Sequence, residues 1–162
     1  MLATETYPRR LIEVDLPIAQ VSEHARNGRS VHHGHITAIH IWWARKPLPS
    51  CRAAALAASL IDPLDPACPD AFKAQARDVL GQLYGTPFNG DCEALRRGLL
   101  RLVSDFASWQ RATDPAFRDA ARTLASSAHA SLFDSGPSFL ADPFCGGGSI
   151  PLEGLRHPTR PT

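Results

Sequence analysis

Apolar residues recur at helical spacing through the middle of the chain. Five of them fall at i, i+4, i+7, i+8 and i+11, with charged residues on the other side: Leu95, Leu99, Leu102, Val103 and Phe106. A second run follows Asp114-Pro115, a helix cap and first-turn proline, and comprises Phe117, Ala121, Leu124 and Ala128. These patterns predict two amphipathic helices, and another helix is expected over about 71–83.

The first sixty residues predict two more helices. One is expected over 17–26, and the turn-forming pair Asn27-Gly28 should end it. The other is the alanine-rich run 51–61, for which Pro47 provides a suitable start. Residues 63–70 carry three prolines and indicate a loop.

Past residue 137 the pattern changes to that of a strand followed by a helix. The apolar run 138–141 leads into the segment DPFCGGGS, Asp142–Ser149, and then into a helix expected over 150–155. The expected fold class is α/β, mostly helical in its amino-terminal part. The chain is divided into an amino-terminal block, a helical insertion and a strand-turn-helix unit: 1–62, 63–137 and 138–162.

Composition places the chain among globular proteins. Of its 162 residues, 44% are hydrophobic and 20% are charged, which argues against disorder and against a coiled-coil rod. No apolar run approaches the roughly 20 residues of a membrane span, and the first residues lack the pattern of a secretory signal. A cytoplasmic protein without a membrane partner is therefore expected. Its four cysteines form no C-x-x-C pair and are expected to be reduced.

Positive charge gathers in one segment. Between Glu23 and Asp62 there are five basic residues and no acidic one, although the whole chain has a net charge of only +1. Such a segment can attract a carboxylate or phosphate, and a solvated face without a ligand explains it equally. For the cluster His32-His33-x-His35, hydrogen bonding is favoured over metal binding, because no cysteine or carboxylate lies nearby in sequence.

The glycine-rich segment is a candidate ligand site. Three consecutive glycines let the backbone approach a bound molecule closely and make positive φ available. The helix that follows would present N–H groups to an anion. The segment is not a Walker loop, because no lysine follows at the required position, and the G-x-G-x-x-G pattern fails at Pro151. Cys145 is interpreted as a small filler rather than a nucleophile.

The string DPFCGGGS resembles the D-P-F-x-G-x-G signature of DNA amino-methyltransferases, whose glycine turn holds the methionine part of S-adenosylmethionine. The string HIWWARKPL at 40–48 is similar in layout to a second block of that family, of the H-P-T-Q-K-P-L kind, and it also precedes the glycine turn. Longer stretches, up to about Arg156, are similar to the amino-terminal domain of large adenine-specific DNA methylases, many of them encoded near restriction and phage-defence genes.

This resemblance implies the start of a Rossmann-like methyltransferase fold, with S-adenosylmethionine as cofactor. DNA, through the complete enzyme, and other defence-system proteins are the implied partners. Segment 40–48 should fold back onto the glycine turn, with the alanine-rich helix packed against the strand before it. Lys46, Arg45 or His40 would then face the cofactor carboxylate. The residues implied to line the cofactor are Asp142, Pro143, Phe144, Gly146 and Gly148.

The sequence also departs from that family. Family members continue into a second strand with an acidic ribose-binding residue and later carry a D-P-P-Y type motif, whereas this sequence contains no Pro-Pro dipeptide. We therefore expect an amino-terminal fragment with the cofactor-binding half of a methylase and no catalytic residue. Two alternatives stay open. One is a non-catalytic helical module that binds DNA or a partner through the basic segment, where Trp42 or Trp43 could stack on a base. The other is a degenerate fragment without function.

Overall fold

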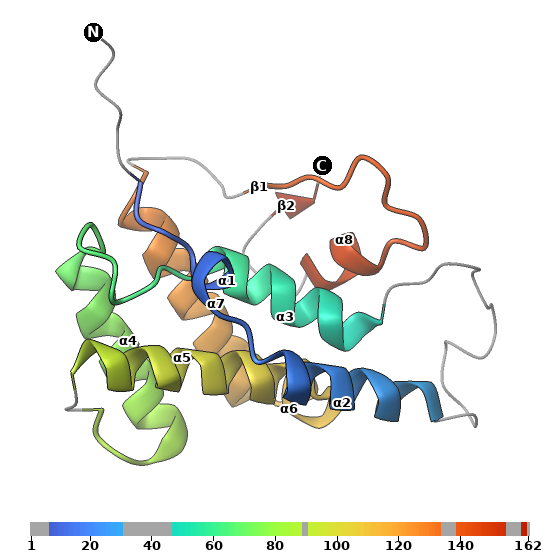
Figure 1. Ribbon diagram of the computed structural model, residues 1–162, viewed down its shortest axis with the longest axis horizontal. Helices are drawn as coiled ribbons and strands as arrows, with labels where there is room; N and C mark the ends of the chain where they lie inside the picture. The colour runs from blue at the N-terminus through green and yellow to red at the C-terminus, as the bar shows by residue number, and fades with distance from the viewer. Residues whose placement is uncertain (1–6, 31–46, 89–90, 134–138, 155–159, 162) are drawn as a thin grey trace, which may run out of the picture.

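The computed structural model describes residues 7–30, 47–88, 91–133, 139–154 and 160–161, and these residues are mostly helical (Figure 1). The helices and strands follow one another as α1 (Leu11–Val14), α2 (Ile18–Ser30), α3 (Leu48–Ser59), α4 (Asp70–Tyr84), α5 (Cys92–Ala107), α6 (Trp109–Thr113), α7 (Pro115–Ala130), β1 (Phe139–Leu140), α8 (Ser149–Gly154) and β2 (Arg160–Pro161). None of the described helices is long and apolar enough to cross a bilayer.

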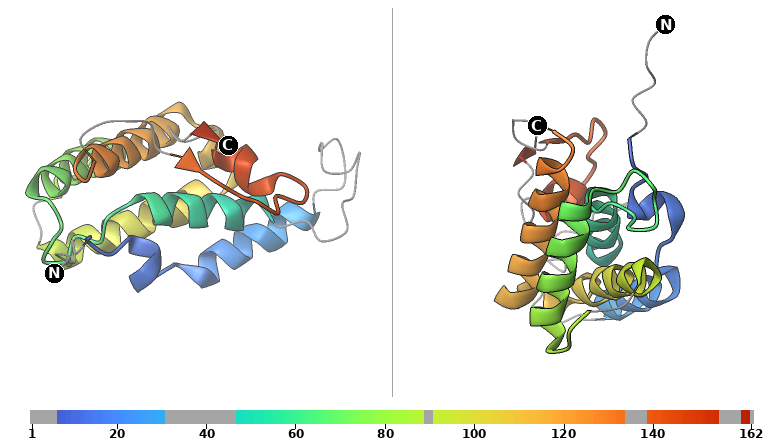
Figure 2. Two further views of the ribbon diagram at one scale, coloured as in Figure 1. Left: turned by 90° about the horizontal axis from the view of Figure 1, so that it is seen from above. Right: turned by 90° about the vertical axis from the view of Figure 1, so that its left-hand side faces the viewer.

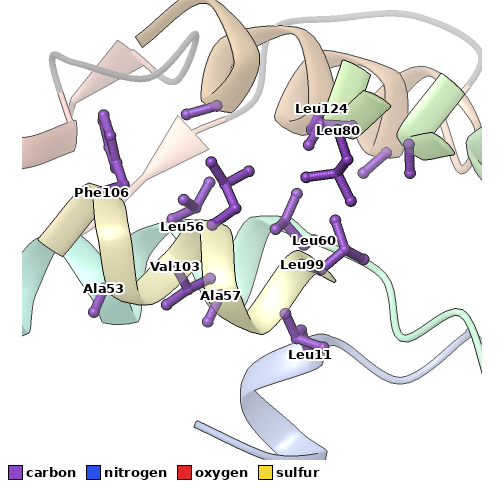
Figure 3. Close-up of a cluster of buried hydrophobic side chains, with 14 of the residues drawn as sticks. Leu11, Ala53, Leu56, Ala57, Leu60, Leu80, Leu99, Val103, Phe106 and Leu124 are labelled. Carbon is purple, nitrogen blue, oxygen red and sulfur yellow. The ribbon is translucent and has the colours of Figure 1, made fainter. Parts of the chain in front are cut away.

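The long helices form two layers. Figure 2 shows α4 and α7 side by side, facing a second layer that contains α2, α3 and α5. Helix α3 is the centre of the arrangement, since it packs against α1, α2, α5, α7 and α8. The side chains between the layers form a single buried cluster (Figure 3), whose fully buried members include Leu56, Leu60, Leu80, Leu99, Phe106 and Leu124.

The two amphipathic helices predicted from spacing are confirmed as α5 and α7. All nine of the apolar residues that defined the two patterns are buried. Both helices begin at an aspartate whose carboxylate accepts a backbone N–H, from Ala94 for Asp91 and from Ala116 for Asp114. Helices α3 and α4 also form within a few residues of the expected bounds, and α4 ends at Gly85, which has φ +65°.

Two helices differ from expectation. Helix α2 does not stop at Asn27-Gly28 but continues to Ser30. A glycine inside a helix costs only about 1 kcal/mol relative to alanine, so the packing of α2 against α3 and α5 can override the local signal. Helix α6 was not expected because five residues are too few to show a periodic pattern; the Ser108 side chain caps its start.

The first described residues attach to the loop that follows α3. The backbone N–H and the Nε of Arg9 both donate to Asp65 Oδ2, at 3.2 and 3.0 Å. Hydrogen bonds from the backbone N–H of Ala67 and from Arg9 hold the pKa of Asp65 below its ordinary value of 3.8. In the same loop, buried Asp62 accepts two hydrogen bonds from the guanidinium of Arg96 on α5. Two acids thus fix the proline-rich loop.

The only sheet among the described residues is a pair of two-residue strands. β1 and β2 are parallel, with Phe139 opposite Arg160 and Leu140 opposite Pro161. A pair this short does not define a Rossmann-like sheet, so the described fold is mostly helical and the start of a methyltransferase fold stays a prediction. The division at 62 and 137 is also untested, although the buried cluster takes residues from both sides of position 62.

Candidate functional site

The glycine-rich segment forms an exposed turn between β1 and α8. Gly146 has φ +53° and Gly148 has φ +73°, a region that disfavours every residue with a Cβ. A Cβ built on Gly148 would meet nothing within 4 Å, and one on Gly146 would meet only Phe144 O at 3.7 Å. The turn is therefore open backbone, and the predicted use of positive φ is confirmed at these two positions.

Three hydrogen bonds shape this turn. The Asp142 carboxylate accepts the backbone N–H of Phe144 at 3.3 Å. The N–H of Gly148 donates to Cys145 O at 2.7 Å, and the N–H of Leu152 donates to Gly148 O at 2.9 Å. The second bond closes the turn itself, and the third links the turn to α8. Helix α8 has only six residues. Its dipole is therefore short and gives little support to the predicted binding of an anion at the helix start.

The residues implied to line a cofactor lie together where they are described. Asp142 is half-buried, Pro143 is exposed, and the ring of Phe144 is 91% exposed on the outside of the turn. Gly146 and Gly148 are the positive-φ positions. Cys145 is also exposed, so its side chain does not fill a gap in the core. His40, Arg45 and Lys46 lie outside the described residues, as do Trp42, Trp43 and the histidine cluster at 32–35.

The helix after the turn lies against α3 (Figure 1), the helix that begins at the last residue of the HIWWARKPL block. The alanine-rich helix was expected to pack on the strand before Asp142, but its main contacts are with α2, α5 and α8. The strand is not its main partner because Ala53, Ala57 and Leu60 are buried in the main cluster. The two sequence blocks are therefore connected through their helices.

A buried ion pair joins these two helices. Arg52 on α3 and Glu153 on α8 are both 0% exposed. The guanidinium donates from Nε to Glu153 Oε2 at 2.7 Å and from Nη2 to Oε1 at 2.9 Å, a bidentate arrangement. Its Nη1 donates to three carbonyl oxygens at the end of α5, at 3.3, 3.0 and 3.1 Å from Phe106, Ala107 and Ser108. Arg52 thus connects α3, α5 and α8.

Sequence reasoning missed this pair, although a signal was present. Arg52 is the only charged residue of α3, and Glu153 is the only acidic residue after Asp142. A lone charge inside an apolar helix is seldom buried without a partner, so two such charges of opposite sign indicate a pair. The pair also reduces the positive charge that the basic segment can offer to a ligand, because Arg52 is one of the five basic residues of that segment. Its charge is neutralised in the core.

The helical region between the two blocks presents little chemistry. Burial raises the pKa of the Cys68 thiol to about 11, which keeps it neutral and unreactive. Burial and a hydrogen bond to Asp105 raise the pKa of Tyr84, whose ring also stacks under the Arg101 guanidinium at 4.1 Å. Within the described part of the chain, no group of three metal-ligating side chains occurs. We interpret this region as scaffold.

Comparison with known proteins gives one finding. A family model described as "Protein of unknown function (DUF1156)" matches residues 15–80, which covers α2, α3 and the HIWWARKPL block but not the glycine turn. No curated protein and no solved structure matches the chain.

Proposed function

We propose that this chain is the cofactor-binding, amino-terminal part of an S-adenosylmethionine-dependent DNA adenine methyltransferase. The observation that carries the proposal is the largely exposed turn at 142–148, whose backbone adopts positive φ at Gly146 and Gly148. Those are the positions at which the D-P-F-x-G-x-G signature requires glycine. The substrate class, adenine in DNA, comes from the resemblance alone.

The residues of the turn suit the cofactor. Open backbone without side chains at Gly146 and Gly148 lets a ligand come close, and the exposed ring of Phe144 is available to cover an apolar part of it. Asp142 holds the turn by accepting the N–H of Phe144. S-adenosylmethionine would supply an activated methyl group, and the role of this chain would be to bind and orient it.

The link between α3 and α8 supports a shared pocket. Helix α3 begins at Leu48, the last residue of the HIWWARKPL block, and packs against α8, the helix that follows the turn. In the proposed pocket, Arg45, Lys46 or His40 would bind the cofactor carboxylate, whose negative charge needs a cation. Arg52 is excluded from that role because it is buried against Glu153.

Calorimetric titration of the 162-residue chain with S-adenosylmethionine tests the proposal. We expect saturable binding at one site per chain, lost in Gly146→Val because a branched side chain is strained at positive φ, and weakened in Asp142→Ala. Gly85→Val is the matched control: it places the same strain at φ +65°, at the end of α4. Absence of binding by the native chain, together with salt-sensitive binding of duplex DNA, would replace the proposal with the helical binding module.

A further inference from the structure

We propose that Arg52 and Glu153 are the positioning residues of the glycine turn. Their buried ion pair fixes α8, and through α8 the turn, in the geometry that binds the ligand. The part of this inference that concerns ligand affinity rests on the proposed function, whereas the part that concerns the turn itself does not.

Helix α8 packs against α3, but it buries few large side chains there. It has six residues, too short to be stable alone. Its buried residues are Ser149, Glu153 and Gly154, so Glu153 is the only large side chain that the helix buries. Of its two large apolar residues, Ile150 is only half-buried and Leu152 is 49% exposed. Small side chains alone would let α8 slide or rotate on α3, and the directional hydrogen bonds of Glu153 prevent this.

The partner of Glu153 is itself immobilised. The planar guanidinium of Arg52 donates from Nε and Nη2 to the carboxylate of Glu153. Its Nη1 donates to carbonyl groups at the end of α5. Phe106 and Ala107 are the last two residues of α5, where the helix dipole has its negative end and favours a cation. Glu153 is therefore tied to two long helices of the main cluster at once.

The position of α8 is passed on to the turn by backbone hydrogen bonds. Leu152 N–H donates to Gly148 O, and Gly148 N–H donates to Cys145 O. No neighbouring atom lies within 4 Å of the place a Gly148 Cβ would take, so packing does not hold the turn there. A shift of α8 would therefore move Gly148 with it. Stability alone does not require such a pair, because well-packed apolar residues often replace a buried ion pair without loss.

The test uses the 162-residue chain with both members replaced, Arg52→Met with Glu153→Leu. The matched control, Arg96→Met with Asp62→Asn, removes a partly buried ion pair that joins the proline-rich loop to α5. Amide hydrogen exchange by NMR reports on the turn without any ligand, at Gly148 and Leu152. Calorimetry with S-adenosylmethionine reports on binding, and exchange within α5 and α7 shows whether the helices stay folded.

In the double variant we expect protection at Gly148 and Leu152 to fall at least about tenfold and the Kd to rise at least about tenfold. Both should be unchanged in the control. Unchanged protection in a folded double variant overturns the positioning role whatever the ligand does. Lost protection with an unchanged Kd overturns the link to binding. Lost protection in a chain that never binds S-adenosylmethionine supports the positioning role and refutes the proposed function. If the double variant does not fold, Glu153→Gln, which keeps the shape of the side chain, is measured in the same way.

Discussion

Removing one member of the Arg52–Glu153 pair should destabilise the whole chain. In Glu153→Leu the guanidinium, 0% exposed in the native protein, loses both bonds to its carboxylate and keeps only its bonds to the end of α5. Leaving a buried charge without its counter-charge typically costs about 3–5 kcal/mol. For a chain of this length, about 2–4 °C is lost per kcal/mol, so the melting temperature should fall by about 6–20 °C.

A double-mutant cycle measures this effect in guanidinium chloride, with Glu153→Leu, Arg52→Met and the two together. The double variant should be only about 1–2 kcal/mol less stable than the native chain, the difference being the lost hydrogen bonds to the α5 carbonyls. The two single losses should therefore sum to much more than the loss in the double variant. A loss below about 1 kcal/mol in Glu153→Leu would refute the buried, charged pair.

Three further outcomes follow from the sequence and the structure. The purified chain should transfer no labelled methyl group from S-adenosylmethionine to adenine in DNA, because it has no D-P-P-Y type motif; incorporation of label would contradict this. Since the pKa of Asp65 is lowered on folding, its contribution to stability is present above pH 3.8 and is lost as the pH falls through the folded-state pKa. The stability advantage over Asp65→Asn should therefore shrink in acid, and parallel pH profiles would be the contrary result. Gly98→Ala places a Cβ 2.5 Å from a ring carbon of Phe88 and 3.0 Å from Leu80, so overpacking of about 1–3 kcal/mol should exceed the helix gain of about 1 kcal/mol. A melting temperature above that of the native chain would show the opposite.

Local patterns predicted most of the helices. The spacing of Leu95 to Phe106 and the Asp114-Pro115 cap act within a few residues, so α5 and α7 can be predicted without knowledge of the rest of the chain. The extension of α2 past Asn27-Gly28 could not be predicted, because packing against other helices outweighs a glycine penalty of about 1 kcal/mol.

The candidate site was also predicted only in part, because local sequence determines some of its features and long-range packing determines the others. Glycine makes positive φ available, and the structure adopts it at Gly146 and Gly148. The packing of α3 against α8 could not be predicted from local sequence. Arg52 and Glu153 are 101 positions apart, and only the folded chain brings them together. The backbone conformation of the turn can be inferred from its own residues, whereas its placement depends on residues far away in sequence.

The most direct measurement of the central proposal is an NMR titration of the isotope-labelled chain with S-adenosylmethionine. We expect saturable shifts of the amide signals of Phe144, Gly146, Gly147 and Gly148, accompanied by shifts within 40–48, the other half of the proposed pocket. Signals from α4 should not move. A titration to saturating ligand in which the turn amides keep their positions would contradict cofactor binding at this turn.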